Sequence, residues 1–115
     1  MSFFDSEVVR AEMTEIQELQ EEVYTKVFEF PSMSKEDKID HVQMLERLLE
    51  KQRVLYTRLS LSDDSEAKMM KENIAKSARM MGMPANIDMS IVFANMEKML
   101  KTMRQHVDKD PSWVL

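Results

Sequence analysis

Hydrophobic residues recur at helical spacing from the start of the chain. Six apolar side chains and one glutamine alternate at intervals of four and three: Val9, Met13, Ile16, Gln20, Val23, Val27 and Phe30. This heptad seam predicts an amphipathic helix, with Asp5 as its N-cap and with Phe4 and Val9 spaced as a hydrophobic staple. We expect Pro31 to end the helix, because proline disfavours the α conformation of the residue before it.

A second seam follows after a short break. Its members are again apolar apart from one glutamine: Ile39, Val42, Leu45, Leu49, Gln52, Tyr56 and Leu59. Ser34 is the expected N-cap of this helix. Because so short a connection joins antiparallel neighbours, the two segments predict a long helical hairpin. A basic stripe on the second helix (Arg47, Lys51 and Arg58) is expected to pair with acidic residues of the first.

Two further helices are predicted, at about residues 64–81 and 88–107. Ser62 and Asp63 are the candidate N-caps of the first of them. Gly82 stands where a left-handed residue closes a helix, because glycine adopts that conformation without steric cost.

The predicted fold class is therefore all-α. It is a long antiparallel helical hairpin with two shorter methionine-rich helices, arranged like a four-helix bundle or a short coiled coil. Residues 1–107 form a single domain in this interpretation, and residues 108–115 form a C-terminal tail.

Composition supports this interpretation. The chain has one glycine, no cysteine and thirteen methionines, nine of which lie between Met69 and Met103. A single glycine leaves little room for tight turns, and the absence of cysteine excludes disulfides and thiolate zinc sites. No apolar run approaches the roughly 18 residues of a membrane span. The start of the chain lacks the pattern of a secretory signal, so we expect a cytoplasmic protein.

The sequence contains no recognisable catalytic or metal-binding pattern. His41 and His106 have no partners at metal-ligand spacing, and a single glycine cannot build a phosphate-binding loop. Carboxylates are plentiful on the first helix, but exposed carboxylates do not acquire raised pKa values through burial. We therefore predict that the protein is not an enzyme and holds no cofactor or metal.

The methionines indicate a docking surface instead. Adjacent residues of a helix point about 100° apart, so neighbouring methionines cannot all face one core. The residues expected to leave apolar surface available to a protein partner are Met69, Met70, Met80, Met81 and Met83. The same pattern is also compatible with a soft core or with a seam between two copies of the chain.

The C-terminal residues Trp113, Val114 and Leu115 are a large apolar group beyond the last predicted helix. They either fold back onto the bundle or enter a pocket of a partner, where tryptophan is favoured as an anchor. The resulting hypothesis is a non-enzymatic adaptor or modulator that binds a protein partner through its methionines and this tail.

An alternative function is an accessory role in a nucleic-acid transaction (transcription or replication), through contact with DNA or RNA or with a clamp or polymerase. Seven cations would form one basic patch if the last two helices packed together: Lys68, Lys71, Lys76, Arg79, Lys98, Lys101 and Arg104. The net charge of −5 opposes this function, and the first thirty residues carry eight acidic groups against two basic ones. A protein partner is therefore favoured over nucleic acid.

Two segments carry a resemblance to a known family: FFDSE at residues 3–7 and RLSLSDD at residues 58–64. Together with residues 93–103, they are similar to a small family of proteins of unknown function from cyanobacteria and their phages. The resemblance covers about residues 3–105 and implies a compact helical protein without known cofactor or catalytic residues. The methionine richness and the Trp-Val-Leu tail depart from the family pattern, which would suit a phage copy adapted to a particular partner.

Overall fold

Helices make up all the regular secondary structure of residues 2–84 and 88–109, which this computed structural model describes. In chain order the elements, with 3₁₀ helices written η, are η1 (Phe3–Asp5), α1 (Glu7–Lys26), η2 (Val27–Ser32), α2 (Lys35–Leu61), α3 (Ser65–Met80) and α4 (Met89–Asp108). The predicted all-α class is confirmed. Within the described ranges, no helix has the length and apolar character that a membrane span requires.

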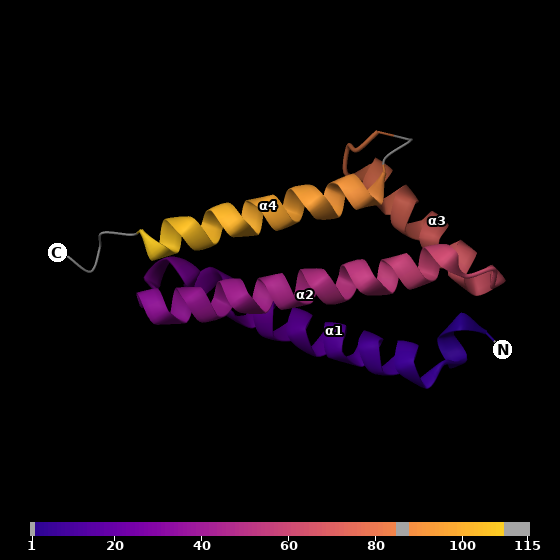
Figure 1. Cartoon of the computed structure of the whole chain (residues 1–115), viewed down its shortest axis with the longest axis horizontal. Helices are drawn as coiled ribbons and strands as arrows, with labels where there is room; N and C mark the ends of the chain where they lie inside the picture. Colours follow the sequence, from indigo (N-terminus) through magenta and orange to yellow (C-terminus); the bar gives the residue numbers. More distant parts are fainter. Residues whose placement is uncertain (1, 85–87, 110–115) are drawn as a thin grey trace.

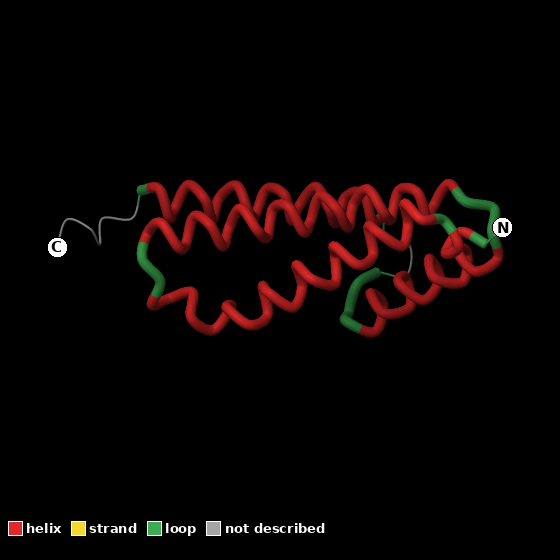
Figure 2. The backbone as a smooth tube through the Cα atoms, turned by 90° about the horizontal axis from the view of Figure 1, so that it is seen from below, coloured by secondary structure: helices red, strands yellow, loops and turns green. Residues whose placement is uncertain are grey.

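α2 is the central element, and the other three α-helices pack against it. α1 and α4 lie on opposite sides of α2, and both run antiparallel to it (Figure 1). Seen at right angles, α3 and the C-terminal half of α1 lie on the same side of the α2–α4 pair (Figure 2). α3 has 16 residues, whereas α4 has 20 and is as long as α1.

The ends of α1 differ from the prediction by a few residues. Ser6 is the N-cap in place of Asp5, because its Oγ accepts a hydrogen bond from the Val9 amide at 3.4 Å. Asp5 belongs to η1, which puts the expected hydrophobic staple out of register. At the other end α1 stops at Lys26, and the chain continues as a 3₁₀ helix that contains Pro31. Such a tightened last turn is common at helix C-termini.

The N-cap of α2 is predicted correctly and that of α3 is not. The Ser34 Oγ accepts a hydrogen bond from the Asp37 amide at 3.1 Å. α3 begins after Asp64, whose carboxylate accepts from the Ala67 amide at 3.3 Å. Ser62 instead stabilises the turn that precedes α3, because its Oγ accepts a hydrogen bond from the Asp64 amide.

Gly82 ends α3 in the left-handed conformation, with a φ of +93°. Its amide donates to the Arg79 carbonyl at 3.0 Å, and the Met83 amide donates to the Ala78 carbonyl at 3.1 Å. These two bonds form a Schellman motif, which satisfies carbonyls left free at the helix end. The glycine therefore closes α3 as predicted.

The contact between α1 and α2 has an apolar centre and a charged edge. Its buried cluster consists of Ile16, Val23 and Leu48. At the edge, Lys51 forms an ion pair with Glu15, and Arg58 lies 3.4 Å from Glu12. The predicted charge pairing within the hairpin is confirmed for these two cations.

Candidate functional site

An apolar cavity of about 470 Å³ is lined by η1 and by side chains of α1, α2, α3 and α4. The residues that enclose it include Phe4, Ile16 and Ile74. Tyr56 and Phe93 also line it, with their ring centroids 5.8 Å apart. Pockets that bind ligands commonly have volumes of roughly 300 to 1,000 Å³. The cavity is therefore large enough to receive side chains of another molecule.

The lining of this cavity is uncharged. Among the described residues that line it, Gln20, Gln52 and Tyr56 are the polar ones, and all others are apolar. Neither glutamine carboxamide has a hydrogen-bond partner within the described ranges. Both side chains are half-buried, so their donors and acceptors remain available. The two glutamines that interrupt the heptad seams thus line one cavity.

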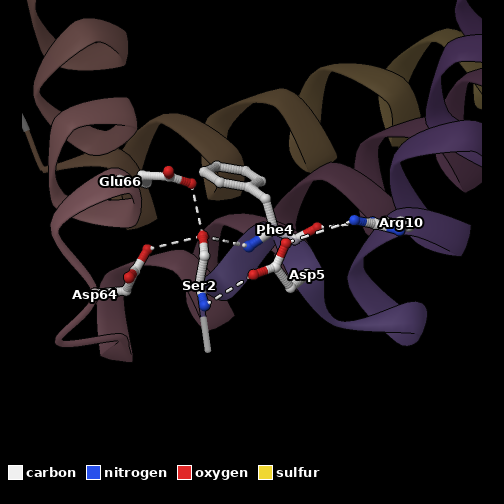
Figure 3. A network of polar contacts seen from close by, with 6 residues as sticks. All are labelled: Ser2, Phe4, Asp5, Arg10, Asp64 and Glu66. Carbon is white, nitrogen blue, oxygen red and sulfur yellow. Dashed lines mark hydrogen bonds and ion pairs between the residues drawn. The ribbon is translucent and has the colours of Figure 1, made fainter.

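The N-terminal segment brings two phenylalanines to the cavity. The Ser2 Oγ donates to Glu66 Oε2 at 2.6 Å and accepts from the Phe4 amide at 3.3 Å (Figure 3). The Ser2 amide donates to Asp5 Oδ2 at 3.1 Å, which completes a capping box on η1. The Phe3 and Phe4 rings stand edge to face, with centroids 5.1 Å apart. This network fastens η1 to the first turn of α3 and places both rings in the cavity wall.

The sequence pattern alone does not identify Phe3, Phe4 or Phe93 as cavity residues. The hydrogen bond that fastens η1 joins residues 64 positions apart, so no local pattern predicts it. The sequence features that could point to the cavity are the FFDSE segment and the single glutamine in each seam. Both are visible in the sequence, but neither can be assigned to a shared site until the packing is known.

The methionines predicted to dock a partner are divided between two surfaces. Met70 lines the cavity, whereas Met69 and Met80 do not and are 65% and 82% exposed. Met81 and Met83, at the end of α3, are also exposed. The expected exposed apolar surface is therefore present, and its role in binding stays a prediction. The remaining predicted docking residues, Trp113, Val114 and Leu115, lie outside the described residues.

The seven predicted cations are divided between two helices, α3 and α4, each of which packs mainly on α2 and not on the other. Arg79 forms an ion pair with a glutamate of its own helix, and Arg104 forms one with Glu46 of α2. Lys98 and Lys101 line a small hollow that also contains carboxylates. These acidic neighbours reduce the local positive potential that phosphate binding requires.

A larger and more polar cleft of about 950 Å³ lies between α2 and α4. Three of its charged residues are already paired: the Arg53 Nη2 donates to Glu50 Oε1 at 2.6 Å, and the Arg53 Nε lies 3.7 Å from Glu97 Oε1. The hydrogen bond from Arg53 lowers the pKa of Glu50. Because these groups already have partners, the apolar cavity is the stronger candidate site.

A family model matches most of the chain. It describes a domain of unknown function, DUF1825, and covers residues 1–107. No curated protein sequence and no solved structure matches the chain. The matched range contains the cavity and both segments that carry the resemblance. The chain therefore belongs to the DUF1825 family.

Proposed function

We propose that this protein is a non-enzymatic docking module that receives a helical segment of another protein chain in its apolar cavity. The observation that carries the proposal is the uncharged lining with its two unpaired carboxamides. An amphipathic helix presents apolar side chains every three or four residues and docks in grooves of this kind. Removal of apolar side chains from water favours such binding.

Methionines of α3 and α4 give the cavity an adaptable wall. Met70, Met89 and Met96 line it, and unbranched thioether side chains repack around different neighbours. Gln20 and Gln52 limit this freedom, because a carboxamide that leaves water needs new hydrogen-bond partners. We therefore expect a partner whose apolar stripe is interrupted by a polar residue.

The exposed methionines outside the cavity and the C-terminal tail extend the proposed interface. Met69 and Met80 offer exposed apolar surface on α3, and Trp113 would serve as an additional anchor. In line with the resemblance, we propose that the adaptor acts in the cytoplasm of a cyanobacterium, and that it is encoded either by the cyanobacterium or by an infecting phage.

An accessory role on nucleic acid has less support, because Arg79 and Arg104 already pair with carboxylates. Salt dependence separates the two functions. Binding to phosphates weakens steeply as salt concentration rises, whereas burial of apolar surface does not.

The test is capture from nuclease-treated cyanobacterial lysate with the full tagged chain. We expect Met96→Glu, which places a charge in the cavity, to reduce the captured partner at least about tenfold, because burial of an unpaired charge is costly. Phe28→Glu is the control, at an exposed residue of η2 that lines none of the cavity, and a chain that ends at Val107 tests the tail. Equal capture by Met96→Glu and the parent chain, with both folded by circular dichroism, would refute the proposal.

A further inference from the structure

A small hollow of about 230 Å³ lies where the helical hairpin turns. In Figure 1 this place is the joined end of the α1–α2 hairpin. No residue of the hollow lines the apolar cavity, so the two are separate features of the fold. The hollow is lined by the end of α1, the connection and the first two turns and a half of α2: Lys26, Glu29, Met33, Asp37, Asp40, His41 and Met44.

His41 is the buried polar residue of this hollow. It is 3% exposed, and its Nδ1 has no hydrogen-bond partner in the described part of the chain. A buried nitrogen without a partner costs free energy, and buried polar groups of folded proteins are nearly always paired. An imidazole that lines a hollow and lacks a partner within the chain is therefore well placed to bind a group from outside it.

Two thioethers line the hollow together with this imidazole. Met44 follows His41 by three residues on α2, so the two side chains leave the same face of the helix with their Cβ atoms about 5 to 6 Å apart. Met33 lies in the connection between η2 and α2 and lines the hollow from there. Both methionines are half-buried. One imidazole and two thioethers form a polarizable donor set, of the kind that binds soft metal ions.

We propose that this hollow is a binding site for Cu(I), with the imidazole of His41 and the sulfurs of Met33 and Met44 as its ligands. Thioether sulfur selects Cu(I) among the common biological metal ions, and imidazole is also a good ligand for copper. The proposal goes beyond the docking function, because it concerns a different set of residues. It also revises the expectation from the sequence that the chain holds no metal.

The charges around the hollow favour a cation. Three carboxylates line it, those of Glu29, Asp37 and Asp40. Lys26 also lines it, but its ammonium lies 3.4 Å from Glu22 of the same helix, which offsets its charge. A lining with more carboxylates than ammonium groups attracts a positive ion.

The same carboxylates do not form a site for a harder metal ion. Among residues 2–84 and 88–109, no group of three histidine, aspartate or glutamate side chains is arranged to hold a metal ion. This argues against the nitrogen and oxygen ligand sets of Zn²⁺ and the oxygen ligand sets of Ca²⁺. Thiolates would compete most strongly for Cu(I), and the chain has no cysteine.

A second pair of residues with the same spacing provides a matched control. Met103 and His106 are also three residues apart, on α4, and neither lines the hollow. His106 is exposed, so its ring nitrogens can hydrogen-bond to water. Coordination at His106 would replace such bonds, whereas coordination at His41 satisfies a nitrogen that has no partner. We therefore place the site at His41 and not at His106.

The test is anaerobic titration of the purified full chain with Cu(I), in competition with a coloured copper chelator. We expect one Cu(I) per chain. Met33→Leu and Met44→Leu conserve the size and apolar character of the side chain but remove the sulfur. Each should weaken binding at least about tenfold, since loss of even an outer partner of a metal ligand costs that much. His41→Gln should weaken it as well, and Met103→Leu should leave the affinity unchanged.

X-ray absorption at the copper edge provides a second measurement, in which we expect nitrogen and sulfur ligands around the ion. A chain that takes no Cu(I) from the chelator would overturn the proposal. Equal affinities of Met44→Leu and Met103→Leu would also overturn it, as would a copper ion surrounded only by nitrogen and oxygen. None of these results decides the docking function, which is tested by capture of a partner without added copper.

Discussion

At the scale of single residues, His41 is an unusual buried polar residue of α2. It is 3% exposed, its Nδ1 has no hydrogen-bond partner within the described ranges, and its ring lies 5.4 Å from that of Phe30. Burial lowers the pKa of His41 below its ordinary value of 6.5, and the nearby charge of Lys26 lowers it further. The folded chain therefore favours the neutral imidazole.

This lowered pKa predicts a pH dependence of stability. Below pH 6.5, the ordinary pKa of histidine, the unfolded chain binds a proton that folded His41 does not. The free energy of unfolding should therefore fall as the pH is lowered through this value, down to the pKa of the folded state. We expect His41→Leu to flatten the dependence between about pH 8 and pH 5, measured by urea unfolding. His106→Leu, at an exposed histidine, is the control, and an unchanged slope in His41→Leu would assign the effect to other groups.

At the scale of elements, the helices that the sequence predicts best are those with strong local signals. The capping serine at residue 34 and the left-handed glycine at residue 82 act through neighbours a few positions away. The start of α1 is missed by one residue, because Asp5 and Ser6 are both good caps and only the η1 turn decides between them. The contact of η1 with α3 could not be predicted, because it depends on tertiary packing.

That contact predicts a measurable role for Ser2. Ser2→Ala removes the bond to Glu66 and the side-chain half of the η1 capping box. Loss of such a cap typically costs about 1 kcal/mol. The free energy of unfolding should fall by about this amount, and the urea midpoint should fall with it. Amides of Phe4 and Asp5 should also exchange faster with solvent. Ser77→Ala, on the exposed side of α3, is the control, and equal exchange in both variants would mean that Ser2 does not hold the segment.

At the scale of the whole molecule, the sequence predicts the helices better than their arrangement. Heptad seams identify the faces that pack, but both α1 and α4 use α2 as their neighbour, and the cavity lies where side chains of η1 and all four α-helices meet. In the sequence, Gln20 and Gln52 are isolated interruptions of two seams. The antiparallel hairpin brings both to one site, which only the three-dimensional structure could reveal.

If two copies of the chain pair through the apolar cavity, as the methionine pattern of the sequence allows, thermal stability must depend on protein concentration. Unfolding of a dimer to separate chains is favoured by dilution, and association contributes to the free energy of unfolding by mass action. For two chains of this length, the midpoint temperature should rise by about 3 °C for each tenfold increase in concentration. Differential scanning calorimetry of the full chain measures this directly. Met96→Glu, in the cavity wall, should lose the dependence while Phe28→Glu, on the exposed surface of η2, keeps it. A midpoint independent of concentration in the parent chain would show that the chain unfolds as a monomer.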